Sequence, residues 1–429
     1  MTMFRFLLIA VAILIYNTVS TCSAETNKND KDDDILSTNL IKWLRNNGAY
    51  INDKLVVKYN GVYRGIYATQ DMEVGEQLCS IPSKLMIQPE KKELIDGEDT
   101  TIYPHCNTIK QVMKELSSDD PTPYGKYLKA QPIGYLPTFW SESAKELLIT
   151  MLKSIQKEYQ TDLEYYGLEY DELPPHGIQY KLDEIQYECN IDDQMMNNPI
   201  YKQAAMLVTA RGDYEYMIPY YDMFNHNNAR YNIHHDYTLD ETPDNRGFTV
   251  SKPVKAGEEL FNAYNRCNIC NDRLDWYGTP EMWLEYGFIE SLPQRWLFDF
   301  ARVKFELEWK DGDESTGEVV VNFLVPMSSK GKRLLQEELT RLNIFADMHR
   351  GKSYEEYVDM SRFEWESLWQ YYDALHNALT HATTRSDVSL SEEVWTLGHD
   401  WWVQDGTLKE EDSEEHYVLR TKSSTNDEL

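Results

Sequence analysis

Positive charge is scarce in this chain. Its 429 residues include 42 Lys and Arg but 72 Asp and Glu, which gives a formal net charge of −30 at pH 7. Non-specific binding of nucleic acids depends on an excess of Lys and Arg that contact the phosphates. The composition therefore argues against a nucleic-acid partner. If the substrate is a macromolecule, the composition favours a basic protein.

The N-terminus has no hydrophobic run long enough to cross a membrane comfortably. Its run FLLIAVAILIY covers residues 6–16 only, whereas a membrane-spanning helix needs about 20 apolar residues. The small-residue stretch TCSA follows and ends at Ala24, which is typical of a secretory signal. We therefore expect residues 1–24 to be a signal peptide rather than a stable membrane anchor.

The opposite end of the chain carries a second possible address. Its last four residues, Asn426–Leu429, read NDEL and are similar to the KDEL-type signal for retrieval to the endoplasmic reticulum. Together with the N-terminal segment, this ending predicts a protein of the secretory pathway that resides in the endoplasmic reticulum lumen.

Cysteine is rare as well. Of the six cysteines, Cys22 would leave with the signal, and the five that remain cannot all pair within one chain. Cys267 and Cys270 form a single CxxC motif, which supplies only half of a tetrahedral zinc site. We favour a local disulfide between these two cysteines, with metal binding as the open alternative.

Aromatic residues, in contrast, are plentiful. The 30 Tyr and 11 Trp suffice to build the cores of two domains, the number that the length favours. The acidic stretch 25–38 has little to bury and is expected to be disordered. Strand-like segments then flank a helical, acidic block at about 89–205, which predicts a β-rich domain at 39–290 with a helical insertion.

The remainder of the chain predicts a second, mostly helical domain at 291–405. It opens with VKFELEW and EVVVNFLVP, whose alternation of apolar and polar residues is typical of a β-hairpin. A long helix with a Trp-rich face is expected from Tyr354 to about His381, and that face is interpreted as core. The charged segment 406–429 forms a tail, and no internal repeat is evident.

Four segments, taken in order, resemble the signatures of a SET domain. They are YRGIYATQDMEVGEQLCSIPSKLMI, IPYYDMFNHN, VKAGEELFNAYN and WLEYGFIE. The resemblance is greatest to the subgroup that contains the Rubisco large-subunit lysine methyltransferases and the actin-histidine methyltransferase. It implies an α+β fold: a β-rich SET domain with a pseudoknot and a helical insertion, followed by a helical substrate-binding domain.

The same resemblance implies a function. It predicts an S-adenosylmethionine-dependent protein N-methyltransferase that acts on a protein substrate, with lysine as the favoured acceptor and histidine as the alternative. Methyl transfer of this kind is an in-line displacement that needs alignment, a neutral acceptor nitrogen and a dry channel, and no metal.

Several residues are assigned to the cofactor by the resemblance. Asn225 and His226 would hold its amino-acid end and its adenine, and Arg211 would lie near its carboxylate. A Gly in a strand also lets the backbone approach a ligand closely, although a simple bulge at Gly65 is the alternative. The complete set expected at the cofactor is Arg64, Gly65, Ile66, Arg211, Asn225, His226, Tyr264 and Phe288.

Tyr264 is the predicted catalytic residue. It ends the segment GEELFNAY, where the resemblance places a Tyr whose hydroxyl points into the methyl-transfer channel. A phenol suits that place because it donates or accepts a hydrogen bond without charge near pH 7. Tyr277, in the longer connection that follows, is the named alternative.

Two other classes of function compete with this interpretation. His234, His235 and Asp236 could begin a two-His-one-carboxylate iron site of an oxygenase, but the later candidates His349, His376 and His381 fall in helix-like sequence. The second rival is a SET-like peptide-binding module without turnover. Cofactor binding and methyl transfer distinguish the three possibilities.

Overall fold

The computed structural model describes most of the chain between residues 30 and 384. The described ranges are 30–59, 63–89, 104–131, 136–152, 182, 185–186, 189–213, 216–235, 245–265, 277–312 and 314–384. The expected signal segment, the CxxC motif and the NDEL ending lie outside these ranges. Among the described helices, none is long and apolar enough to cross a membrane.

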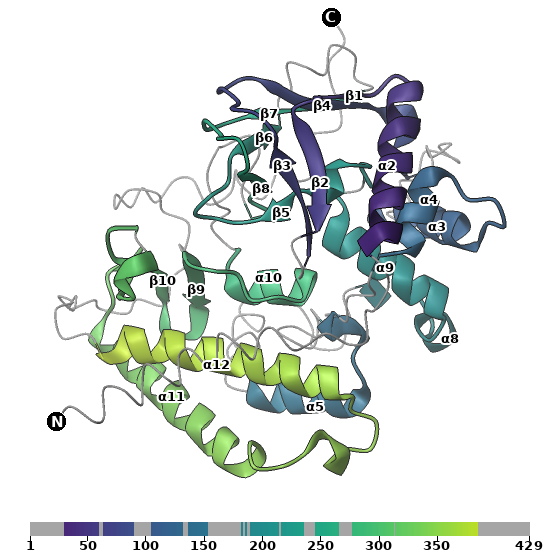
Figure 1. Ribbon diagram of the computed structural model, residues 1–429. Coiled ribbons are helices and arrows are strands. Elements are labelled where there is room, and N and C mark those ends of the chain that lie inside the picture. The colour runs from purple at the N-terminus through teal and green to yellow at the C-terminus, as the bar shows by residue number, and fades with distance from the viewer. Residues whose placement is uncertain are drawn as a thin grey trace, which may run out of the picture.

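Two four-stranded sheets occupy one end of the molecule (Figure 1). The first has the order β1-β4-β7-β6 and the second the order β2-β3-β8-β5. Their strands are β1 (Tyr50–Ile51), β2 (Leu55–Tyr59), β3 (Arg64–Ala68), β4 (Gln77–Pro82), β5 (Asn225–His226), β6 (Ile233–His235), β7 (Asn245–Val250) and β8 (Glu259–Asn262). The predicted strand-rich segments therefore meet in space, although about 150 residues separate β4 from β5 in the sequence.

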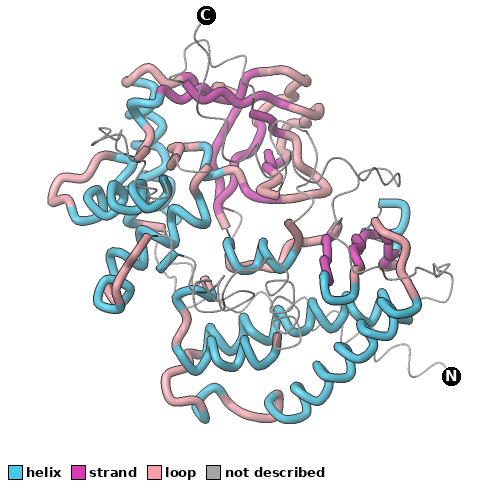
Figure 2. The backbone as a smooth tube through the Cα atoms, turned by 180° about the vertical axis from the view of Figure 1, so that it is seen from behind, coloured by secondary structure: helices cyan, strands magenta, loops and turns pink. Residues whose placement is uncertain are grey.

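Helices flank the sheets and fill the opposite end of the molecule, as the view from behind also shows (Figure 2). They are α2 (Asp30–Asn46), α3 (Pro104–Ser117), α4 (Pro123–Lys129), α5 (Glu142–Met151), α8 (Asp193–Met196), α9 (Pro199–Arg211), α10 (Thr279–Tyr286), α11 (Ser329–His349) and α12 (Arg362–Thr384).

The expected disorder of residues 25–38 is wrong for its second half. Helix α2 begins at Asp30, nine residues earlier than the start at residue 39 expected for the SET domain. Ser37, Leu40 and Leu44 are buried on this helix, so tertiary packing fixes its later turns. Once a helix is nucleated, each added residue contributes one hydrogen bond at little further cost, and the acidic residues extend the helix.

The helical insertion is not a single unit. Helix α3 packs against α9 and α4, beside the two sheets. Helix α5 instead packs against α12 at the far end of the molecule (Figures 1 and 2). The backbone N–H of Ser141 donates to Glu364 Oε1 over 2.5 Å, and Leu147, Leu148 and Met151 share a core with the C-terminal domain. Part of the insertion thus joins the two domains.

The hairpin predicted for the C-terminal domain is confirmed. Strands β10 (Val303–Trp309) and β11 (Val319–Phe323) pair antiparallel, and β9 (Gln294–Phe298) completes a three-stranded sheet. The alternate residues Val303, Phe305 and Leu307 are buried. The period-two pattern in the sequence therefore identified the face of β10 that meets the core.

The long C-terminal helix starts later than expected. Residues Tyr354–Glu356 form a short 3-10 turn, and α12 begins at Arg362. Ser361 and Glu364 exchange hydrogen bonds, since Ser361 Oγ accepts from the Glu364 N–H and Glu364 Oε2 accepts from the Ser361 N–H. This capping box fixes the helix start. Trp369 is buried as part of the core, as predicted.

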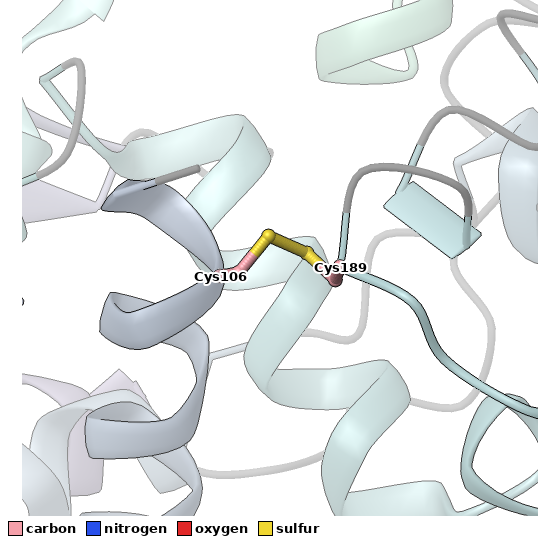
Figure 3. The surroundings of a disulfide bond; sticks show 2 residues. All are labelled: Cys106 and Cys189. Atoms are coloured by element: carbon pink, nitrogen blue, oxygen red, sulfur yellow. A yellow bond between two sulfur atoms is a disulfide. The ribbon is translucent and has the colours of Figure 1, made fainter. Parts of the chain in front are cut away.

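A disulfide bond joins Cys106 on α3 to Cys189 in the segment before α8 (Figure 3). The sequence did not predict this pairing, because 83 residues separate the two cysteines. Cys79 is a buried free thiol.

Loss of this disulfide should destabilise the protein. The bond closes a long loop and restricts the unfolded chain, an effect that typically amounts to 2–4 kcal/mol. We expect a double Cys106→Ala, Cys189→Ala variant to lose about 2 kcal/mol, the lower end of that range, because α3 and α9 still pack together without the bond. Urea unfolding measures the loss, and a reductant should destabilise the wild type but not the variant.

Candidate functional site

Asn225 lies where three strands meet. It belongs to β5, which pairs parallel with β8, and β8 pairs antiparallel with the Gly65-bearing strand β3. The Asn225 side-chain amide nitrogen donates to the main-chain oxygen of Arg64 and to Glu259 Oε1, each over 2.7 Å. The structure thus brings together Asn225 and the β3 segment, two parts of the site that the sequence predicted separately.

Gly65 is closely packed at this junction. A Cβ atom built on Gly65 would lie 2.1 Å from Glu259 Oε1 and 3.0 Å from Asn225 Nδ2. The pairing of β3 with β2 runs without interruption from Arg64 to Ala68, so Gly65 is not a bulge. Its neighbour Ile66 is fully buried in the core. Only a residue without a side chain allows the backbone and the two polar groups to approach this closely.

His226 is held from both sides of its ring. Its Nδ1 accepts a hydrogen bond from the Tyr264 N–H over 3.0 Å. In the neutral ring the proton must then be on Nε2, which lies 3.1 Å from Glu290 Oε2. The imidazole therefore ties strand β5 to the chain just after β8.

Glu290 is a buried residue that accepts hydrogen bonds from several side chains of the site, and the sequence did not predict this role. It is 2% exposed, and besides His226 it accepts a hydrogen bond from Thr279 Oγ1 over 2.7 Å and one from Asn228 Nδ2. A buried carboxylate needs such partners to offset its lost hydration. The only sequence signal for it was a single Glu that ends the otherwise apolar GFIE segment.

The two arginines of the predicted site have different roles. Arg211 ends α9, and its Nη1 donates to the main-chain oxygen of Asp222 over 3.0 Å. The Arg64 side chain points instead to the insertion, where Nη2 donates to Gln131 Oε1 over 2.7 Å and the guanidinium lies over the Tyr127 ring. Arg64 contributes its main chain to the Asn225 junction, and its side chain anchors α4.

Asp222 is an acid held in a buried position. Burial raises the pKa of its carboxyl group to about 6, against the opposing charges of Arg211 and Arg64. A carboxyl group with a raised pKa stabilises the fold while it is protonated, and this contribution is lost as pH rises through the window from about 3.8 to about 6. Ionisation of Asp222 therefore lowers the stability of the fold as pH rises through this window.

The variant Asp222→Asn should remove this pH dependence. A shift of about two pKa units corresponds to about 3 kcal/mol, so the variant should gain about that much relative to wild type between pH 4 and pH 7. Urea unfolding at both pH values measures the difference. Asp119, an exposed carboxylate on the loop after α3, provides the control through Asp119→Asn, and equal pH profiles for wild type and Asp222→Asn would contradict the prediction.

Three tyrosines lie just after β8, just before α10 and on α10. Tyr264 Oη donates to the main-chain oxygen of Phe224 over 2.8 Å, and its ring centroid lies 4.7 Å from that of Tyr286. Tyr277 Oη donates to Glu285 Oε2 over 2.5 Å. Burial raises the pKa of all three phenols, so each is neutral at pH 7. The contacts of the described residues do not distinguish Tyr264 from Tyr277 as catalyst, and both assignments stay predictions.

Tyr286 is the member of this cluster that the sequence analysis passed over. Within the part of the chain that the structure describes, its hydroxyl makes no hydrogen bond, whereas the hydroxyls of Tyr264 and Tyr277 both do. Its position just before Gly287, whose φ of +74° ends α10, was the available signal. Phe288 follows, 36% exposed, with its ring 5.9 Å from that of His226.

The metal hypothesis depends on one residue that the structure does not describe. His234 and His235 are neighbours on β6, and successive strand residues point to opposite faces, while Asp236 lies outside the described ranges. Among the described residues, the one group of three potential ligands within reach of an ion is His105, Cys106 and Cys189. Its two cysteines are joined in the disulfide. His349, His376 and His381 lie on α11 and α12.

Comparison with known proteins identifies the fold around this site. The SET domain model matches residues 63–265. The chain is similar to an [Fructose-bisphosphate aldolase]-lysine N-methyltransferase, chloroplastic, of Arabidopsis thaliana, with 29% identity over 278 residues, 60% of this chain and 52% of the relative. It is also similar to N-lysine methyltransferase setd6 of Xenopus tropicalis, with 25% identity over 285 residues, 59% of this chain and 57% of the relative.

The crystal structure of the SET domain of LSMT bound to lysine and AdoHcy is a distant structural neighbour. It shares 13% identity at a TM-score of 0.43, with 80% of this chain and 91% of that chain covered. The alignments with the two lysine methyltransferases span only about half of each relative. The matched range nevertheless contains β3, α9, β5, β8 and Tyr264, and thus most of the site described above. Residues 63–265, a little less than half of this chain, thus match the SET domain.

Proposed function

We propose that this protein is an S-adenosylmethionine-dependent protein-lysine N-methyltransferase. The observation that carries the proposal is the junction of Asn225, Gly65 and Tyr264, which adjoin one another within the matched SET domain. The two relatives named as lysine methyltransferases support the same reaction. Histidine as the acceptor is the alternative outcome of the test below.

The residues present fit the cofactor. Both donors of the Asn225 amide are used within the protein, and among the described residues no donor reaches its Oδ1. That oxygen is therefore an acceptor suited to the ammonium group of an amino acid. Arg211 supplies a half-buried positive charge that suits a carboxylate, and Gly65 lets the β3 backbone approach a ligand.

The cofactor would supply an electrophilic methyl group on a positively charged sulfur. The protein would align the acceptor nitrogen with that methyl group, exclude water and avoid a competing charge. Neutral tyrosine hydroxyls suit this role, because they can hydrogen-bond to the acceptor without adding negative charge. The cluster of Tyr264 and Tyr286 is proposed to line that part of the site.

The test is methyl transfer from labelled S-adenosylmethionine to proteins of a luminal extract by the purified protein. Amino-acid analysis of the labelled product then distinguishes methyl-lysine from methyl-histidine. Cofactor binding without any transfer would instead favour the SET-like peptide-binding module. A basic protein is the proposed substrate, because the chain carries a net charge of −30 and acidic surfaces attract basic partners.

The protein is further proposed to act in the lumen of the endoplasmic reticulum. The Cys106–Cys189 disulfide supports this, since such bonds persist in oxidising compartments and are rare in the cytosol. Deletion of Asn426–Leu429 from the full chain should release the protein into the medium, because retrieval receptors recognise the similar KDEL ending. Immunoblots of cells and medium measure the change, and unchanged retention would mean that NDEL is not an address.

A further inference from the structure

We propose that Glu259 is a positioning residue that fixes the side-chain amide of Asn225 so that only its carbonyl oxygen faces the ligand. The inference rests on the proposed cofactor site and adds to it a residue outside the predicted set. Glu259 is the first residue of β8, directly beside the junction at Gly65.

The orientation of the Asn225 amide follows from its neighbours. Arg64 O and Glu259 Oε1 both lie 2.7 Å from the same amide atom, and a main-chain carbonyl and a carboxylate can only accept hydrogen bonds. The atom between them must be the NH2 group. Without Glu259, a single carbonyl would hold the amide, and the side chain would be free to rotate about its last bond.

Glu259 is itself held in place from two directions. Tyr67 Oη donates to its second oxygen, Oε2, over 2.9 Å, and Tyr67 and Glu259 are cross-strand partners in the β3–β8 pairing. On the other side, the carboxylate occupies the space that a Cβ atom at position 65 would need. The Glu259 carboxylate is thus held by Tyr67 and packed beside Gly65, and its Oε1 accepts the hydrogen bond from Asn225.

This unit has a chemical consequence for ligand choice. A fixed amide with its oxygen outward accepts a hydrogen bond from an N–H donor such as an α-ammonium group, and the nearby carboxylate charge adds to the attraction of a cation. The benefit of Glu259 should therefore depend on the amino group of the ligand. A general effect on folding would weaken every ligand alike.

The test compares two ligands on three variants by calorimetry. The ligands are S-adenosylhomocysteine and its analogue without the α-amino group. Glu259→Ala should weaken S-adenosylhomocysteine about tenfold or more, because the Asn225 amide loses one of the two hydrogen bonds that orient it, but weaken the analogue less than about threefold. Glu259→Gln should stay within about threefold of wild type for both ligands, because its amide oxygen can still accept from Asn225.

Glu258→Ala is the matched control, because Glu258 is the exposed neighbour of Glu259. It should change neither affinity. Equal losses for the two ligands in Glu259→Ala would overturn the inference while leaving the cofactor site intact. A wild type that binds neither ligand would overturn the proposed function and this inference together.

A second variant keeps the test decisive if Glu259→Ala does not fold. Tyr67→Phe removes only the hydrogen bond to Glu259 Oε2. It should weaken S-adenosylhomocysteine by about threefold, the lower end of the range for a lost hydrogen bond, and leave the analogue unchanged. Equal affinities of this variant and wild type for both ligands would overturn the inference in that case.

Discussion

Replacement of Asn225 by alanine should weaken binding of S-adenosylmethionine by about 10- to 100-fold, as expected for the loss of a buried polar contact worth about 1–3 kcal/mol. Turnover at limiting cofactor should fall by the same factor, because the contact is made both before and during the reaction. The structural basis is the Asn225 Oδ1 acceptor, which has no donor among the described residues while Nδ2 is bound to Arg64 and Glu259.

Asn227→Ala is the matched control for this prediction. Asn227 lies two residues further on, and its side-chain oxygen accepts from the Arg230 N–H within the following turn. Its loss should leave cofactor affinity within about threefold of wild type. Calorimetry for binding and labelled-methyl incorporation for turnover cover both variants, and an unchanged affinity in a folded Asn225→Ala protein would remove Asn225 from the cofactor site.

The parts of the site that could be predicted were those encoded by local patterns. The segments around Gly65, Asn225 and Tyr264 each carry their own signature, and the structure brings them together through β3, β5 and β8. The C-terminal hairpin was likewise predictable, because a period of two in a short segment specifies one face of a strand. In each case neighbouring residues in the sequence contain the signal.

The parts that could not be predicted depend on contacts between distant segments. Glu259 matters because Asn225, 34 residues away in the sequence, donates to it, and Glu290 because the chain folds His226 against it across 64 residues. Neither glutamate differs in its own sequence context from many exposed ones. The same reason explains the Cys106–Cys189 bond.

The predicted placement of α5 within the SET domain was wrong for a related reason. Its sequence predicts a helix correctly, but the partner of its apolar face is α12, more than 200 residues later. Periodicity shows that a face will be buried and does not show against which element. The insertion therefore looked like one unit of the SET domain, although its α5 segment is packed into the C-terminal core.

The different hydrogen bonds of the three tyrosines predict different effects when each hydroxyl is removed. Tyr264→Phe should leave cofactor affinity within about threefold of wild type and lower the methyl-transfer rate by about 10- to 100-fold or more, because an interaction that orients the reacting groups contributes mainly in the transition state. Tyr277→Phe should keep nearly the full rate. The hydroxyl of Tyr277 donates a hydrogen bond to Glu285, and loss of that bond leaves the nitrogen that accepts the methyl group unaffected.

Tyr286→Phe tests whether Tyr264 or its neighbour Tyr286 orients the amine that accepts the methyl group. The ring centroids of Tyr264 and Tyr286 are 4.7 Å apart, yet the Tyr264 hydroxyl already donates its proton to Phe224 O and keeps only its lone pairs for an acceptor amine. If Tyr264 alone orients that amine, Tyr286→Phe should stay within about threefold of the wild-type rate. Single-turnover rates at saturating cofactor measure all three variants. A full rate for Tyr264→Phe together with a slow rate for Tyr286→Phe would assign the catalytic role to Tyr286. Among the described residues, the hydroxyl of Tyr286 has no hydrogen-bond partner, so it can act as donor or acceptor.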